Sequence, residues 1–256
     1  MVVNKETIRK NFSRYAQHYD DYCTIQHLCA FRLVDELRAD SFSDILDIGC
    51  GTGNYTSLLR KRFPKAMITA LDISREMIDI ARSKLGTDSI DFIMADAEEI
   101  DLRKSFDLIS SNATFQWFDD MVESLAKYKK LLNEDGLISF SAFGPLTFFE
   151  LNISLQELFK EETAISSLGF VEKETLEEGL KPLFSEVEVE EELYKERYGS
   201  LGELLKKIKY SGVRGGGLGR SGFWTQEKLN RLEDIYKNNF GEIIATHQVF
   251  FCRGVR

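Results

Sequence analysis

Along the first forty residues, apolar side chains recur at the spacing of an amphipathic helix. The series runs through Ile8, Phe12, Tyr15 and Tyr19, and a second series covers residues 28–37. Side chains three and four positions apart lie on one face of a helix. We therefore expect residues 5–38 to be helical, within an N-terminal helical cap over residues 1–40.

From residue 41 to residue 145, short apolar runs alternate with amphipathic stretches. The runs predict strands at 44–48, 67–71, 90–94, 106–110 and 136–143, and the stretches predict helices at 55–63, 74–85 and 121–132. Strands that alternate with helices at this spacing are typical of a parallel sheet covered on both faces. The predicted fold class is α/β, with a doubly wound, mostly parallel sheet.

The remaining residues, 146–256, are less regular. They predict helices at 148–159, 172–180, 201–210 and 225–239, strands at 187–190 and 243–252, and a glycine-rich turn at 212–222. We interpret the helices between the two late strands, about residues 196–240, as a lid over the carboxyl edge of the sheet. All three segments are expected to form one domain, and the acidic run 186–192 to be a solvated strand face.

Composition and charge narrow the class of protein. The chain has 256 residues, is 43% hydrophobic and carries a formal net charge of −9, which is typical of a soluble globular protein and unfavourable for binding nucleic acid. There is no leader-like segment and no apolar run of membrane-spanning length, so we expect a cytoplasmic monomer that binds no membrane. The four cysteines and three histidines lack metal-ligand spacing, so we expect no metal.

The first predicted strand of the sheet ends in a glycine-rich turn. Asp47 precedes Gly49, Gly51 and Gly53, which alternate with other residues. Glycines allow a tight turn whose backbone N–H groups approach a ligand closely. The spacing differs from the GxGxxG pattern of pyrophosphate sites, and Asp47 would repel a phosphate but accept a hydrogen bond from an ammonium group. The turn therefore points to a ligand with an amino-acid end.

Two further carboxylates follow the next two predicted strands. Asp72 ends the second strand, where a carboxylate can bridge the hydroxyls of a ribose. Asp96, with Ala97, follows the third strand, where an adenine amino group would need an acceptor. Each aspartate alone is equally well read as a helix N-cap. Together with the glycine turn at one sheet edge, they predict a nucleoside-containing ligand.

Residues 40–145 resemble the class I S-adenosylmethionine-dependent methyltransferases, which have a Rossmann-like fold. The resemblance is carried by the motif Asp47-Ile48-Gly49-Cys50-Gly51-Thr52-Gly53. It implies that S-adenosyl-L-methionine is the cofactor and S-adenosyl-L-homocysteine the product. It places the three glycines near the methionine part, Asp72 with Ile73 at the ribose, and Asp96 with Ala97 at the adenine. Asn112 belongs to the same expected set.

Nearly the whole chain resembles the malonyl-acyl carrier protein O-methyltransferases of biotin synthesis. The matching segments are 12–20 (FSRYAQHYD), 110–117 (SSNATFQW), 141–151, 205–213 and 244–251. Two positions depart from the family pattern: the alanine at 16 is shifted, and Ala142 replaces a threonine. Trans-aconitate methyltransferases share the Asn and Gln-Trp element of the second segment, so that segment discriminates less.

This resemblance implies methyl transfer to the free carboxylate of a malonyl group on acyl carrier protein or on coenzyme A. Such a carboxylate is ionised at neutral pH, so the transfer needs no general base. Two alternatives stay open: a methyltransferase for a small carboxylate of the trans-aconitate type, and a non-catalytic cofactor-binding protein.

Specific residues are expected to bind or surround the methyl acceptor. Tyr19 is expected to act in catalysis as a cap over the amino-acid end of the cofactor, and Phe115 and Trp117 to be pocket walls. Lys209 and Arg220 are the preferred anchors for the malonyl carboxylate, with Arg214 as a third candidate. These anchors lie in a segment, residues 203–220, that holds five basic residues and one acid. That excess predicts a docking surface for an acidic carrier protein, with Lys206 and Lys207 in contact with it.

Overall fold

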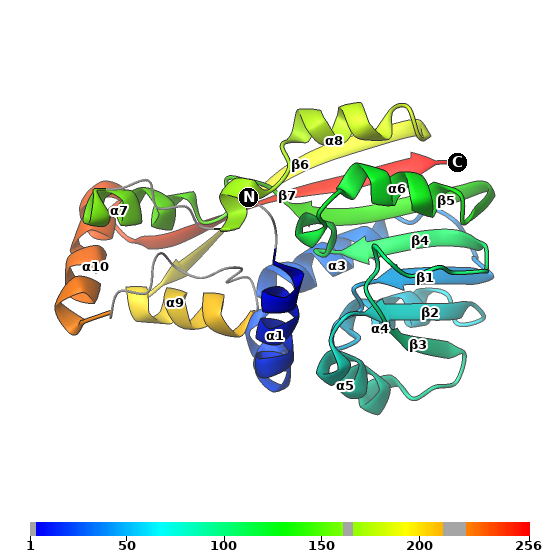
Figure 1. The fold of residues 1–256 in the computed structure, drawn as a ribbon, viewed down its shortest axis with the longest axis horizontal. Helices are drawn as coiled ribbons and strands as arrows, with labels where there is room; N and C mark the ends of the chain where they lie inside the picture. Colours follow the sequence, from blue (N-terminus) through cyan, green and yellow to red (C-terminus); the bar gives the residue numbers. More distant parts are fainter. Residues whose placement is uncertain (1–3, 161–165, 212–223) are drawn as a thin grey trace.

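The computed structural model describes residues 4–160, 166–211 and 224–256. Within them, one seven-stranded sheet has the order β3-β2-β1-β4-β5-β7-β6 (Figure 1). The strands are β1 (Asp44–Ile48), β2 (Met67–Asp72), β3 (Ile90–Met94), β4 (Phe106–Asn112), β5 (Leu132–Phe143), β6 (Ser185–Tyr198) and β7 (Ile243–Val255). The first five are parallel, and β7 runs antiparallel to both β5 and β6. The predicted mostly parallel α/β sheet is confirmed.

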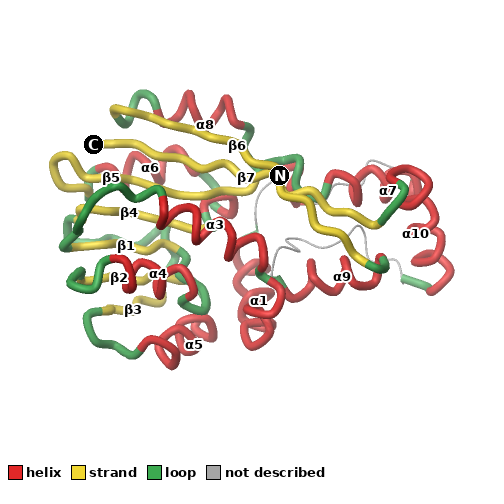
Figure 2. The backbone as a smooth tube through the Cα atoms, turned by 180° about the vertical axis from the view of Figure 1, so that it is seen from behind, coloured by secondary structure: helices red, strands yellow, loops and turns green. Residues whose placement is uncertain are grey.

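Helices cover both faces of this sheet. One face carries α3 (Thr24–Asp35), α4 (Asn54–Arg62) and α5 (Arg75–Leu85), and the other carries α6 (Met121–Lys129) and α8 (Lys173–Leu180). Figure 1 views the face with α6 and α8, and Figure 2 views the face with α3 and α4. Each helix buries its apolar side on the sheet, which gives one hydrophobic core on each face. The central strands between these cores are buried on both sides and mostly apolar, as is typical of parallel strands.

A third core lies beyond the end of the sheet. Strands β6 and β7 extend past their neighbours as a two-stranded ribbon, and α7 (Phe149–Phe159), α9 (Leu201–Tyr210) and α10 (Gln226–Phe240) pack around it. Helices α9 and α10 follow β6 and precede β7. The predicted helical insertion between two late strands is thereby confirmed. The glycine-rich turn predicted at 212–222 lies outside the described residues.

The N-terminal helix is broken where one continuous helix was predicted. Helix α1 (Lys5–Tyr15) is followed by a 3-10 turn, η1 (Ala16–His18), then by α2 (Tyr19–Tyr22) and α3. The break brings Asp20 to the glycine turn, where its Oδ1 accepts hydrogen bonds from Thr52 Oγ1 at 2.5 Å and Asn54 Nδ2 at 2.9 Å. These contacts between distant segments favour the break at η1 over the straight helix that the apolar spacing predicts.

The acidic run at the start of β6 faces solvent, as predicted. Five of its glutamates are exposed, and two of them, Glu190 and Glu192, pair with Arg32 of α3. Among the described residues, no group of three or more Cys, His, Asp or Glu side chains is placed to hold a metal ion. No described helix is long and apolar enough to cross a membrane.

Lys207 does not belong to a docking surface, contrary to the prediction. Its side chain is buried, with Nζ donating to Thr24 Oγ1 at 3.1 Å and pairing with Glu196 of β6. Glu196 also accepts a hydrogen bond from the Tyr198 hydroxyl at 2.8 Å and lies 3.1 Å from His247 Nε2. Burial alone would raise the pKa of Glu196, but His247 and Lys207 outweigh it and lower this pKa to about 2. Lys207 therefore joins α9 to the ribbon and to α3.

We expect Lys207→Met to destabilise the protein by about 2–4 kcal/mol at pH 7, because it leaves Glu196 charged and half-buried without its cation. Because the pKa of Glu196 is lowered in the folded state, the contribution is complete above about pH 4.5 and is lost as the pH falls toward 2. Urea unfolding at several pH values measures both effects. The matched control is Lys206→Met, one position earlier and exposed. Equal losses in both variants would contradict the assignment.

Candidate functional site

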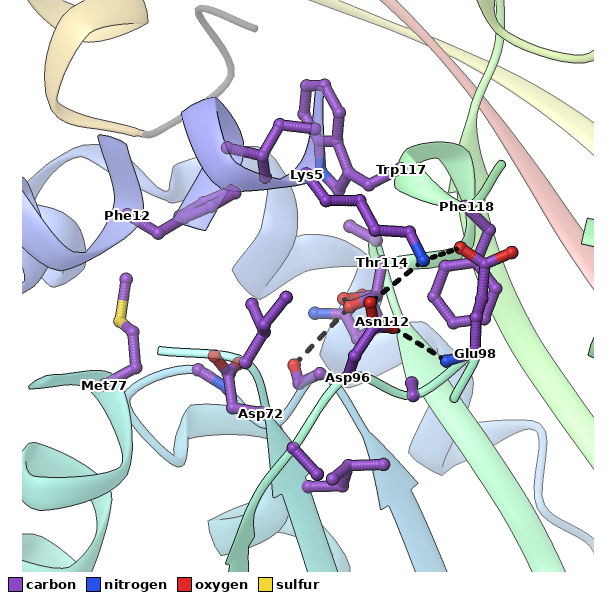
Figure 3. A pocket seen from close by; sticks show the side chains of 18 of the residues that line it. Lys5, Phe12, Asp72, Met77, Asp96, Glu98, Asn112, Thr114, Trp117 and Phe118 are labelled. Atoms are coloured by element: carbon purple, nitrogen blue, oxygen red, sulfur yellow. Dashed lines mark hydrogen bonds and ion pairs between the residues drawn. The ribbon is translucent and has the colours of Figure 1, made fainter. Parts of the chain in front are cut away.

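A cavity opens at the carboxyl ends of the parallel strands, beneath α1 (Figure 3). Its walls come from α1, from the turn after β1, from the ends of β2 and β4, and from the segment after β3. The empty space between them is about 760 Å³, including the part that is open to solvent. The edge where parallel strands end is the usual ligand site of such sheets. All the residues predicted at the strand ends except Asp47 and Gly53 line this cavity.

The glycine turn follows β1 and is fixed to the end of β2. The backbone N–H groups of Gly49 and Cys50 both donate to the carbonyl of Leu71, at 2.7 and 2.9 Å. Gly49 and Gly51 have φ values of +73° and +54°, which disfavour any other residue. A Cβ at Gly49 would meet the Thr114 side chain at 2.0 Å, whereas a Cβ at Gly51 would meet nothing within 4 Å. Gly51 therefore presents bare backbone to open space in the cavity.

Gly53, the third glycine of the turn, packs against α5. It has φ +85° and does not line the cavity. A Cβ here would meet Leu85 at 2.9 Å and Ala81 at 3.1 Å, both on α5. Gly53 thus allows the N-terminus of α4 to pack closely on α5, and its contact with the cofactor stays a prediction.

Asp72 faces the cavity and also holds the glycine turn. Its Oδ2 accepts a hydrogen bond from the Gly51 N–H at 2.9 Å, and its Oδ1 accepts one from the Ser74 N–H at 2.8 Å. Burial raises the pKa of this carboxyl to about 6, although the backbone donors act in the opposite direction. Ile73 lines the adjoining wall. The carboxylate keeps free lone pairs beside the cavity, which suit hydroxyl donors such as those of a ribose.

Asp96 lines the cavity beside Lys5 of α1, as Figure 3 shows. Ala97 lines the same part of the wall. Lys5 Nζ lies 2.9 Å from Asp96 Oδ2, 2.8 Å from Glu98 and 3.7 Å from Asp119. Burial would lower the pKa of Lys5, but its hydrogen bonds to Glu98 and Asp96 raise it. This contact could not be predicted from the local pattern, because Lys5 and Asp96 are 91 positions apart.

Aromatic side chains form much of the apolar wall. The ring of Phe12 on α1 meets Tyr19 and Trp117 edge-on, with centroids 6.1 and 6.2 Å apart, and all three residues line the cavity. Trp117 is a pocket wall, as predicted. Phe115 is not, because it is fully buried in the core on the other face of the sheet, against Tyr128 and other rings.

Asn112, at the end of β4, lines the cavity, but its side chain is engaged elsewhere. Its Nδ2 donates to the carbonyl of Gln26 at 2.9 Å, and its Oδ1 accepts from Ser141 Oγ at 2.8 Å. The side chain therefore fixes the first turn of α3 against β4 and β5. This positions α3 beside the glycine turn.

Of the predicted carboxylate anchors, Lys209 lies in the part of the chain that the structure describes. Lys209 is exposed near the end of α9, with Nζ 5.5 Å from the Tyr15 ring centre and 5.0 Å from that of Tyr210, and it does not line the cavity. Arg214 and Arg220 lie outside the described residues.

Asp47 lies beneath the glycine turn and does not line the cavity. Its Oδ2 accepts a hydrogen bond from Thr56 Oγ1 at 2.6 Å, while Oδ1 is buried without a partner among the described residues. Burial raises the pKa of this carboxyl to about 7. An unpaired buried carboxylate oxygen is costly. The contact of Asp47 with an ammonium group stays a prediction, because Asp47 does not line the cavity.

We expect Asp47→Asn to stabilise the ligand-free protein at pH 8 by about 1–3 kcal/mol, because it removes a buried negative charge. The pKa of Asp47 is raised in the folded state, so the charge begins to oppose folding as the pH rises above 3.8 and opposes it fully above about 7. The gain should therefore shrink when urea unfolding is measured at pH 4.5. Asp91→Asn, an exposed strand carboxyl, serves as the control. A pH-independent effect of Asp47→Asn would exclude the burial argument.

Comparison with known proteins agrees with this geometry. The family model described as "Methyltransferase domain" matches residues 46–140. The crystal structure of the YcgJ protein from Bacillus subtilis superposes with a TM-score of 0.63 at 14% identity, covering 90% of this chain and 98% of that chain. At this level of identity the likeness shows the shared fold alone.

Sequence relatives cover the chain from end to end. The malonyl-acyl carrier protein O-methyltransferase of Acetivibrio thermocellus is 36% identical, over 98% of this chain and 93% of its own length. The malonyl-acyl carrier protein O-methyltransferase 2 of Ilyobacter polytropus is also 36% identical, over 99% of both chains. The similarity includes the helices around the ribbon as well as the cofactor-binding half. On this similarity, the chain belongs to the malonyl-acyl carrier protein O-methyltransferases.

Proposed function

We propose that this protein transfers a methyl group from S-adenosyl-L-methionine to the free carboxylate of a malonyl group carried by acyl carrier protein. The observation that carries the proposal is the 36% identity to enzymes of that name over nearly the full length of both chains. Methylation neutralises the carboxylate, so the product can enter the apolar chain-extension steps of biotin synthesis, the role that the family resemblance implies.

The cavity has the features that the cofactor requires. Gly51 leaves open space at the turn, and Asp72 offers acceptors for ribose hydroxyls. Asp96 and the backbone of Ala97 stand at the end proposed for adenine, and Tyr19 stands beside the glycines at the end proposed for the amino acid. These features of the cavity wall support S-adenosyl-L-methionine as the ligand.

The bound cofactor supplies an electrophilic methyl group on its sulfonium sulfur. The acceptor carboxylate is already ionised at neutral pH, so this chain has to position it and to exclude water, and no proton has to be removed. Ile8, Phe12 and Trp117 provide apolar walls, which help to exclude water from the cavity. A dry cavity also leaves the carboxylate less solvated and more reactive.

The proposed carrier-docking surface includes the exposed lysines of α9. Lys206 lies over the Tyr22 ring at 5.7 Å, and Lys209 lies over Tyr15 and Tyr210. Both are exposed, in contrast to Lys207. They stand beside the N-terminal helices that cover the cavity, a position that suits the steering of an acidic carrier toward the site.

We expect Gly51→Ala to weaken binding of S-adenosyl-L-homocysteine at least tenfold, because the new methyl group would occupy space that the ligand needs. The fold should persist, since the Cβ meets no protein atom within 4 Å and the strain of a positive φ is only about 1 kcal/mol. Titration calorimetry measures the affinity. Gly241→Ala, which also has a positive φ and open surroundings at the end of α10, controls for backbone strain. Unchanged affinity in Gly51→Ala would contradict the cofactor assignment at the turn.

A methyl-transfer assay on three acceptors tests the function itself. We expect malonyl-acyl carrier protein and malonyl-coenzyme A to be methylated faster than trans-aconitate, because the family acts on malonyl thioesters. A faster rate on trans-aconitate than on both thioesters would establish the small-carboxylate alternative. Binding of S-adenosyl-L-homocysteine without transfer to any of the three would establish the non-catalytic alternative.

A further inference from the structure

A second, smaller cavity adjoins the main one on the side of α3. The two share Tyr19, Gly49, Gly51 and Asn112, so the glycine turn forms a wall of both. The space in the second cavity is about 320 Å³, including the part open to solvent. It therefore extends the cofactor cavity past the turn that is proposed to hold the amino-acid end.

The charges of the two cavities differ. The main cavity is lined by Asp72, Asp96 and Glu98, and its cation Lys5 is paired with carboxylates. Among the described residues that line the second cavity there is no carboxylate, and His27 is the only basic side chain. The Asp20 carboxylate accepts hydrogen bonds from two residues of this wall, Thr52 and Asn54, but it is paired with Lys84. The second cavity therefore suits a ligand carboxylate better than the main cavity does.

His27 is held in place in the first turn of α3. Its backbone N–H donates to the carbonyl of Cys23 at 2.9 Å, and the Gln26 carbonyl beside it accepts from Asn112 at 2.9 Å. The ring is half-buried, with Nε2 3.5 Å from Cys23 Sγ. No described carboxylate forms an ion pair with His27, although eighteen ion pairs occur elsewhere in the described chain.

We propose that His27 is a cofactor-binding residue whose imidazole donates a hydrogen bond to the α-carboxylate of the methionyl end of S-adenosyl-L-methionine. The proposal rests on the proposed function, because it takes the cofactor and its direction in the cavity from there. The amino-acid end is zwitterionic and needs a donor for its carboxylate as well as an acceptor for its ammonium. His27 supplies the donor at the cavity wall.

The test compares two ligands that differ only at this end. S-adenosyl-L-homocysteine carries the amino acid, whereas 5′-methylthioadenosine keeps the adenosine and the sulfur and lacks it. By titration calorimetry, we expect His27→Ala to weaken the binding of S-adenosyl-L-homocysteine roughly tenfold, which is the usual effect of losing a hydrogen bond to a charged group. Binding of 5′-methylthioadenosine should stay within twofold of that of the unmodified protein. His27→Arg, which keeps a donor and a positive charge, should restore most of the affinity.

His18→Ala is the matched control, because His18 is an exposed histidine on the neighbouring turn and lines neither cavity. It should change neither affinity, and circular dichroism with thermal unfolding verifies the fold of each variant. Equal weakening of both ligands in His27→Ala, or no weakening of either, would overturn the role of His27 while leaving the proposed function intact. Failure of the unmodified protein to bind S-adenosyl-L-homocysteine would instead overturn the proposed function.

Discussion

The turn between β1 and α4 is the constraint on which the site depends. Its N–H groups at Gly49 and Cys50 converge on one carbonyl of β2, and the Asp72 carboxylate holds Gly51. These bonds tie together two neighbouring parallel strands at their carboxyl ends. The positive φ values at the glycines are the conformational cost of this arrangement. In return, the turn presents backbone to both cavities at once, and Asp20, Thr114 and Asn112 are arranged around it.

Much of this could be predicted from the sequence, because the relevant signals are local. Apolar runs mark the parallel strands, and the residues that end them meet at one edge whatever the details of packing. Asp72 and Asp96 therefore reach the cavity as expected. The motif does not show which of its own residues reach the cavity. Asp47 and Gly53 belong to the same motif as Gly49 and Gly51, which line the cavity. Asp47 nevertheless lies beneath the turn, and Gly53 packs on α5.

Contacts between distant segments explain what the sequence could not predict. Lys5 reaches Asp96 across 91 positions, and nothing in α1 distinguishes it from an exposed lysine. Lys206 and Lys207 are adjacent and chemically alike, but one faces solvent and the other pairs with Glu196 in the interior. Phe115 and Trp117 lie on one 3-10 turn, which directs their rings to opposite sides of the sheet. In each case, the direction of a side chain is decided by a partner that the local pattern does not contain.

The ribbon of β6 and β7 carries a group of helices beyond the end of the sheet, and this group is joined to α3 through Lys207. Helices α7, α9 and α10 share a core that has no residue in common with the cores on the faces of the sheet. Packing changes propagate mainly through shared contacts. Substitutions in the ribbon cluster can therefore alter the region beside α1 without disturbing the glycine turn. An architecture of this kind separates the packing of the ribbon helices from the packing of the glycine turn.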